Sequence, residues 1–263
     1  MRTVARKTWS FFEEFVTEGD NFLPPDNFQE DPPGGVAHRT SPTNIGLSLL
    51  SSLTAYDFGY LPMGSLLRRT GNTLGAMTRM EKFRGHFYNW YDTKTLVPLE
   101  PRYISSVDSG NLAGHLIVLR SGLAELRGER IVSRNLFRGL SDTLRALEES
   151  LSGGSGKKTE AARKALHGTT AKIAELRERL ETQPDSLSLI YGLLGRFAAE
   201  SAEMLSESAV MGSRAAEKWT RAFLAECQES LGDIAFLAPW VLLESEHPGT
   251  REAGGLRPRR RKP

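Results

Sequence analysis

The sequence predicts an all-α protein made of helical hairpins, with one short β-hairpin-like insertion near residues 86–108. Three observations support this prediction. Apolar residues recur at helical spacing through most of the 263 residues, Pro- and Gly-rich stretches separate these segments, and one aromatic run lacks helical periodicity. With 39% hydrophobic and 25% charged residues, the composition is that of a folded globular chain.

The first 40 residues are expected to form a helix followed by an extended connector. Residues 3–18 predict a short amphipathic helix whose aromatic residues are Trp9, Phe11, Phe12 and Phe15. The connector, GDNFLPPDNFQEDPPGG, contains four prolines and no helical period. Because Phe22, Leu23 and Phe28 would be out of place in a free linker, we expect the connector to pack along the body of the protein.

Two helices are expected between this connector and the aromatic run. Ser41 has the character of an N-cap, with Pro42 at the first helical position. The apolar face of this helix is expected to hold Ile45, Leu49, Leu50 and Leu53. The next helix is expected over residues 64–82, with an inward face formed by Leu67, Leu74 and Met77 or Met80.

Behind the aromatic run, the sequence predicts a series of helices of similar length. Leucines spaced four, three and four residues apart mark the first of them, between Leu112 and Leu123. The others are expected at residues 129–151, 157–181, 185–207 and 212–236. Their inward residues include Leu166, Ile173, Leu176 and Leu180 in one helix and Trp219, Phe223, Cys227 and Leu231 in another. The stretch 151–160 predicts a flexible loop.

Several functional classes are not expected from the composition. The single cysteine, Cys227, permits no internal disulfide and fits a reducing compartment such as the cytoplasm. No run of about 18 apolar residues is present, so no membrane span is expected, and Glu13 and Glu14 interrupt any signal-peptide core. The net charge of +2 comes largely from a basic tail, predicted to be disordered, at 244–263, so no nucleic-acid partner is expected. The five histidines lack metal-ligand spacing, and no phosphate loop is present, so neither metal nor cofactor is expected.

The aromatic run, GHFYNWYDTKTLVPLEPRYISSVDSGNLAGHL at residues 85–116, is the most distinctive feature of the chain. Residues 86–92 and 102–108 alternate bulky and polar groups, which predicts a short antiparallel pair. Asp108 then has two interpretations that are compatible with each other. It caps the following helix, or it faces a ligand.

A sugar site is one interpretation of the aromatic residues. Tyr88, Trp90 and Tyr91 offer ring faces of the kind that stack on pyranoses, and Asp92 and Asp108 are candidates for the carboxylate pair of glycoside chemistry. The alternative is that the aromatics only fill a core between helix ends. The residues alone favour this second interpretation, and they leave the separation of the two carboxylates open.

Three motifs, in order along the chain, carry a family resemblance. They are LPPDNFQE at 23–30, RTSPTNIGLSLLSSLTAYDFGYL at 39–61 and the aromatic run. Together they resemble the central region of bacterial cyclic β-1,2-glucan synthases, with similarity from about Trp9 to about Trp240. That family consists of very large inner-membrane proteins with a glucosyltransferase domain, a central glucoamylase-like (α/α)6 domain and a phosphorylase-like domain. The resemblance implies that residues 1–243 form one incomplete α/α toroid, the N-terminal half of the central domain.

The resemblance also implies a function. The family's central domain is implicated in closing the glucan ring by transglycosylation, so the chain is expected to contribute to β-1,2-glucan binding and ring closure with the remaining domains of the synthase. The later Gly-Ser-Met-Phe-Glu-Tyr-like segment, expected to hold a catalytic glutamate, is not in this sequence. The chain alone is therefore expected to be inactive and, with exposed helix faces, poorly soluble or self-associating. The alternative is a non-catalytic helical scaffold that binds glucan or protein.

Eight residues are implied to contact the glucan. Trp90 and Tyr91 are expected to stack on glucose units, and hydroxyl groups are expected to bind Asn44, Asp57, Asp92, Arg102, Asp108 and Asn111. On this view the catalytic acids belong to the missing part of the domain, which weakens Asp92 and Asp108 as a catalytic pair.

Overall fold

The computed structural model describes the backbone of residues 1–152 and 159–246 and the side chains up to residue 243. Most of the loop predicted at 151–160 and nearly all of the tail predicted at 244–263 lie outside the described residues. Within them, the all-α prediction is confirmed, because helices dominate and strands occur only as short pairs. None of the described helices is long and apolar enough to cross a membrane.

Nine α-helices and two 3-10 turns make up the described helical structure. The helices are α1 Arg2–Phe15, α2 Pro42–Phe58, α3 Met63–Arg79, α4 Ser106–Glu125, α5 Leu136–Ser152, α6 Glu160–Glu181, α7 Leu187–Met211, α8 Arg214–Leu237 and α9 Trp240–Glu246. The 3-10 turns are η1 Glu18–Asp20 and η2 Leu126–Gly128. The predicted helices are therefore present, most of them with ends shifted by a few residues.

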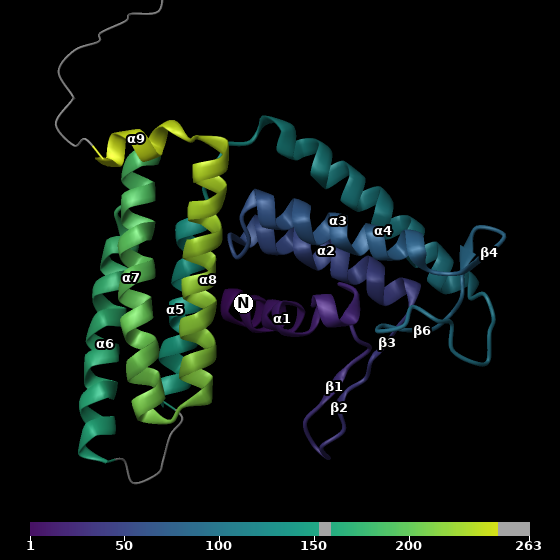
Figure 1. The fold of residues 1–263 in the computed structure, drawn as a ribbon, viewed down its shortest axis with the longest axis horizontal. Helices are drawn as coiled ribbons and strands as arrows, with labels where there is room; N and C mark the ends of the chain where they lie inside the picture. The colour runs from purple at the N-terminus through teal and green to yellow at the C-terminus, as the bar shows by residue number, and fades with distance from the viewer. Residues whose placement is uncertain (153–158, 247–263) are drawn as a thin grey trace, which may run out of the picture.

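The helices α5 to α8 form a four-helix bundle in which consecutive helices run antiparallel (Figure 1). Its core contains fully buried leucines from α5 and aromatic residues from α7 and α8, among them Leu140, Leu144, Leu147, Phe197 and Phe223. Ile173, Leu176 and Leu180 of α6 join this core, as their spacing predicts, and so do Trp219 and Cys227 of α8.

The helices α2, α3 and α4 form a second group beside the bundle, and α1 lies between the two groups in contact with α2 and α5 (Figure 1). The α2 helix begins as predicted, with Ser41 as N-cap accepting a hydrogen bond from Asn44 N and Pro42 at the first position. It ends at Gly59, whose φ of 84° is the left-handed conformation that glycine adopts without strain. A side chain at Gly59 would also overlap the backbone of Asn135, so this glycine permits close approach of the segment leading into α5.

The predicted inward face of α3 is partly wrong. Met77 and Met80 are buried, but Leu67 and Leu74 are exposed. The buried face instead follows Leu66 and two threonines, Thr70 and Thr73. Because threonine is counted as polar, the apolar pattern alone selects the neighbouring face.

The strands also differ from the prediction. The pairs are β1 Phe28–Gln29 with β2 Gly35–Val36, β3 Arg39–Thr40 with β6 Tyr91–Asp92, and β4 Lys82–Phe83 with β5 His86–Phe87, all antiparallel. Residues 86–92 and 102–108 do not form the predicted pair, because β6 pairs with the connector strand β3 and α4 already begins at Ser106. A hydrogen bond of 2.9 Å from Asn89 N to Tyr103 O still links the two runs.

The connector packs on the body as expected. Leu23 is fully buried in the core between α2, α3 and α4, and the Phe28 ring stacks on Phe15 of α1 at 5.0 Å. The described helices thus form a bundle and a second helical group, and the toroidal arrangement of hairpins stays a prediction.

Candidate functional site

The structure brings four of the predicted site residues to one end of the second helical group. The helices α2 and α4 lie side by side with their N-termini at the same end, next to β3 and β6 (Figure 1). We call this region the N-terminal rim and define it by Asp26, Arg39, Thr43, Asn44, Trp90, Asp108 and Asn111.

One half of the rim is a hydrogen-bonded cluster between the first turns of α2 and α4. Thr43 Oγ1 donates to Asp108 Oδ1 at 2.5 Å and accepts from Asn111 Nδ2 at 3.1 Å. The carboxylate of Asp108 lies in the first turn of α4, where the helix dipole favours negative charge. The cluster presents a carboxylate, an amide and a hydroxyl group side by side.

Asp108 does not cap its helix, so that interpretation is wrong. The N-cap is Ser105, whose side chain accepts from Asp108 N at 3.1 Å. The helix begins three residues earlier than the Asp-Ser pair indicates, because Ser105 is an equally good cap and precedes it. The Asp108 side chain is thereby left for contacts across the rim.

The other half of the rim joins the connector, α2 and the aromatic segment. Arg39 donates to Asp26 Oδ2 from Nε at 3.1 Å and from Nη2 at 2.9 Å, and Asn44 Nδ2 donates to Asp26 Oδ1 at 3.3 Å. The Arg39 guanidinium also lies 4.9 Å from the centre of the half-buried Trp90 ring. Sequence reasoning missed Asp26 and Arg39 as site residues, although both lie within the quoted motifs.

Tyr91 is not available to a ligand, so its predicted stacking role is wrong. Its side chain is fully buried, and its hydroxyl accepts from Tyr88 N and donates to Glu81 O, both at 2.7 Å. Burial raises the pKa of Tyr91 to about 12. Because β6 pairs with β3, Tyr91 faces the core while its neighbour Trp90 lies at the surface.

Asp92 has a structural role in a tight turn. Its Oδ1 accepts hydrogen bonds from Lys94 N at 2.9 Å, Thr95 N at 2.8 Å and Thr95 Oγ1 at 3.0 Å. Partial burial would raise the pKa of Asp92, but these hydrogen bonds and the Lys94 charge lower it below its usual value. The carboxylates of Asp92 and Asp108 have different hydrogen-bond partners, Asp92 within its own turn and Asp108 in Thr43 of α2, and their role as a catalytic pair stays a prediction.

The two remaining predicted residues lie outside the rim. Arg102 is exposed and forms an ion pair of 3.0 Å with Glu100, its guanidinium lying 6.0 Å from the Tyr88 ring. Asp57 is near the C-terminus of α2, thirteen residues from Asn44, which places it about 20 Å away along the helix. Burial and the nearby Glu125 raise the pKa of Asp57. Asp57 therefore lies outside the rim, and its contact with the glucan stays a prediction.

Comparison with known proteins shows that part of this chain is similar to a bacterial glucan synthase. No protein-family profile matches the chain. Over 121 residues, the chain is 57% identical to the cyclic beta-(1,2)-glucan synthase NdvB of Rhizobium meliloti (strain 1021). The matched segment is 46% of this chain but only 4% of that protein. This similarity confirms the resemblance to such a synthase. It supports the interpretation that the chain is a fragment of one.

Proposed function

We propose that the chain is a segment of a cyclic β-1,2-glucan synthase that contributes to glucan binding and to ring closure by transglycosylation in the whole enzyme. The observation that supports this most directly is the 57% identity over 121 residues. Because the match spans 4% of the relative, the chemistry is assigned to the whole protein and not to this chain alone. On this proposal the chain is the N-terminal half of a glucoamylase-like α/α toroid in a synthase at the inner membrane.

The N-terminal rim is the proposed glucan contact. Asp108, Asn111 and Asn44 offer a carboxylate and two amides, which together donate to and accept from sugar hydroxyl groups. The half-buried Trp90 ring, held by Arg39, is the proposed platform for the apolar face of one glucose unit. Arg102 is a proposed outer contact, whereas Tyr91 has a structural role in the core and Asp92 one in its turn.

This role is tested by mixing the full chain with linear β-1,2-glucan and measuring both binding and product formation. We expect weak binding by calorimetry and no cyclic or length-redistributed product by mass spectrometry, because transglycosylation also needs catalytic acids and exclusion of water. Detection of such products would show that the chain is catalytic by itself.

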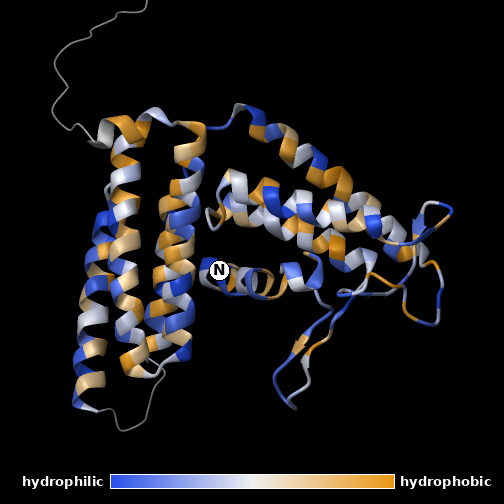
Figure 2. Ribbon diagram, in the orientation of Figure 1, coloured by the Kyte–Doolittle hydropathy of each residue, from blue (hydrophilic) through white to orange (hydrophobic). Residues whose placement is uncertain are grey.

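A second candidate function is a non-catalytic helical scaffold that binds glucan or another protein. The observation that favours it is the exposed apolar surface where α8 meets α9, with Phe236 at 84% and Trp240 at 53% exposure. Figure 2 shows hydrophobic residues concentrated in α9 at this end of the bundle. A chain that binds no glucan but self-associates in size-exclusion chromatography would favour the scaffold.

A further inference from the structure

Two adjacent clefts lie beside α5, at the end of the bundle where α5 begins and α6 ends. The first, of about 620 Å³, is lined by residues 130–134, by the loop between α6 and α7 and by the first turns of α5 and α7. The second, of about 330 Å³, is lined by α5, the end of α6 and Arg2 of α1. Phe137 and Gln183 line both clefts. We call the pair the arginine groove, and none of its lining residues belongs to the N-terminal rim.

Four arginines line the groove without an acidic partner among the described residues. Arg130, Arg134 and Arg145 are exposed and form no hydrogen bond, ion pair or ring contact with any described residue. Arg138 donates only to Asn135 Oδ1, at 3.4 Å. A guanidinium group carries five N–H donors in a fork that matches acidic oxygen atoms. These donors are therefore available to an acidic ligand.

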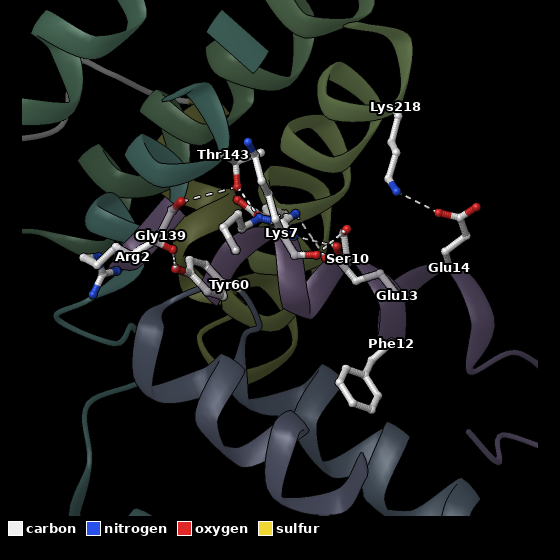
Figure 3. A network of polar contacts seen from close by, with 12 residues as sticks. Arg2, Lys7, Ser10, Phe12, Glu13, Glu14, Tyr60, Gly139, Thr143 and Lys218 are labelled. Atoms are coloured by element: carbon white, nitrogen blue, oxygen red, sulfur yellow. Dashed lines mark hydrogen bonds and ion pairs between the residues drawn. The ribbon is translucent and has the colours of Figure 1, made fainter. Parts of the chain in front are cut away.

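The acidic residues of the groove do not balance its arginines. Among the described residues, six arginines line the two clefts, against Asp142, Glu181 and Asp185. Asp142 is already paired with Arg2 at 2.6 Å. Figure 3 shows Arg2 beside Tyr60, whose hydroxyl group donates to Arg2 O at 3.1 Å. Because Arg2 and Asp142 neutralise each other, the excess positive charge of the groove belongs to the arginines without acidic partners.

This excess is local and is not a property of the whole chain. The sequence has 34 basic and 32 acidic residues, of which residues 244–263 hold six and three, so residues 1–243 hold 28 and 29 and carry a net charge of −1. The lining of the groove, with six arginines and three acidic residues, carries +3. A concentration of one sign of charge in a cleft attracts ligands of the opposite sign.

The spacing of the arginines favours a ligand with several acidic groups. Arg138 and Arg145 lie seven residues apart on α5, which is two helical turns, or about 10 Å along the helix axis. Arg134 precedes Arg138 by four residues and continues the row beyond the start of the helix. A single carboxylate or phosphate group is too small to contact the whole row. The ligand is therefore elongated, with acidic groups distributed along it.

Apolar side chains beside the arginines favour a peptide over other polyanions. Ile131, Val132 and Leu187 are half-buried in the wall of the first cleft. An inorganic polyphosphate has no apolar group to contact them, and a planar bilayer surface does not follow a concave wall. A peptide that contains both acidic and aliphatic residues complements both parts of the lining.

We propose that the arginine groove is a docking surface for an extended acidic segment of a protein. Its carboxylates pair with Arg134, Arg138 and Arg145, and its aliphatic side chains contact Ile131 and Leu187. In an extended segment, side chains on one face repeat about every 7 Å, so two or three glutamates match the row of arginines. This inference rests on the groove alone and does not depend on the proposed role in glucan binding.

The test measures the fluorescence anisotropy of a labelled eight-residue peptide, with six glutamates and two leucines, during titration with the full chain. We expect saturable binding that weakens as the salt concentration rises, because exposed charges are screened. The double variant Arg134→Gln with Arg145→Gln is expected to bind the peptide about tenfold more weakly. The matched control is Arg163→Gln with Arg221→Gln, because these exposed arginines pair with glutamates of their own helices. It removes the same charge and is expected to leave peptide binding unchanged.

Three results would overturn the proposal. Equal weakening by the two double variants would show that the peptide responds to net charge and not to the groove. Equal affinity for the same peptide with glutamine in place of glutamate would show that acidic groups are not recognised. Binding of tripolyphosphate or of phosphatidylglycerol vesicles that is lost in the groove variant, without binding of the acidic peptide, would assign the groove to phosphate groups instead.

Two further measurements keep the test independent of folding and of the glucan proposal. If circular dichroism shows that the groove double variant is unfolded, the single variants Arg134→Gln and Arg145→Gln replace it, and each is expected to weaken peptide binding about threefold. Binding of linear β-1,2-glucan is expected to be the same in the groove variant and the unmodified chain. The two proposals can therefore fail separately.

Discussion

The Arg6 guanidinium on α1 lies 2.9 Å from the Glu226 carboxyl group on α8, and both side chains are buried. A third partner, Glu13, contacts the same guanidinium from about two turns further along α1. Additional contacts join α1 to the bundle, since Arg2 pairs with Asp142 of α5 at 2.6 Å. A buried ionic network therefore joins the N-terminal helix to the four-helix bundle.

Removing the cation of this network is expected to destabilise the fold strongly. Arg6→Met fills similar volume but leaves the Glu226 carboxyl group buried without its cation, and only the hydrogen bond from Thr143 Oγ1 to Glu226 Oε1 remains. This loss is expected to cost roughly 3–5 kcal/mol of unfolding free energy. Urea denaturation followed by circular dichroism measures this loss. Lys218→Ala, which breaks the partly exposed pair with Glu14, is the control and is expected to change stability by less than about 1 kcal/mol. Equal effects of the two variants would contradict a structural role for the network.

The same network is expected to make stability depend on pH. Burial raises the pKa of Glu226 to about 8, more than the Arg6 charge lowers it, and the neighbouring Glu13 carboxylate adds to the increase. Because the folded-state pKa exceeds the usual value of 4.5, the proton stabilises the folded state, and this contribution is lost as pH rises from about 4.5 through about 8. The contribution of Glu226 to the unfolding free energy is therefore expected to decrease as the pH rises from about 4.5 to about 8.

The measurement is a series of urea midpoints between pH 5 and pH 8, compared with Glu226→Gln. Glutamine has the shape of the protonated acid but does not titrate, so the decline is expected to be smaller in this variant. Parallel pH profiles for the two proteins would show that Glu226 is not the group responsible.

Local signals in the sequence located much of the fold. The start of α2 follows from Ser41 and Pro42, because capping depends on a few adjacent residues. The inward face of α3 was not predictable in the same way, because Thr70 and Thr73 occupy it and the pattern counts them as polar. Hydrophobic periodicity locates a helix more reliably than it orients one whose buried face is mixed.

The site was less predictable because its geometry depends on distant contacts. Trp90 and Tyr91 are adjacent, and which of them faces outward is set by the pairing of β6 with β3, some fifty residues earlier in the chain. The partnership of Arg6 with Glu226 joins opposite ends of the sequence, and no spacing rule connects them. The residue types in the motifs therefore predicted a site. They did not predict which of the motif residues have side chains that face it.

Close contact between α2 and α4 is expected to depend on Gly46. A Cβ at this position would overlap the Nδ1 and ring of His115 on α4, so Gly46→Ala is expected to destabilise the protein by about 1–3 kcal/mol. Gly75→Ala in α3 is the matched control. Its added Cβ meets nothing within 4 Å, and alanine favours the helix, so stability is expected to rise by about 0.4–1 kcal/mol. Thermal melts of both variants measure the difference, and a stabilising Gly46→Ala would contradict the described packing.

The rim is expected to bind glucan more weakly when its half-buried aromatic residue, Trp90, is removed. Trp90→Ala deletes the proposed stacking platform. Aromatic contacts contribute about 0.5–1.5 kcal/mol, so the affinity for linear β-1,2-glucan is expected to be roughly two- to tenfold weaker. Tyr91→Phe is the control, because it removes two hydrogen bonds of a buried hydroxyl group and leaves the surface unchanged. That variant is expected to lower the melting temperature while binding stays the same. If Tyr91→Phe weakens binding and Trp90→Ala does not, the glucan does not contact the rim through Trp90, and the proposed orientation of the aromatic segment is incorrect.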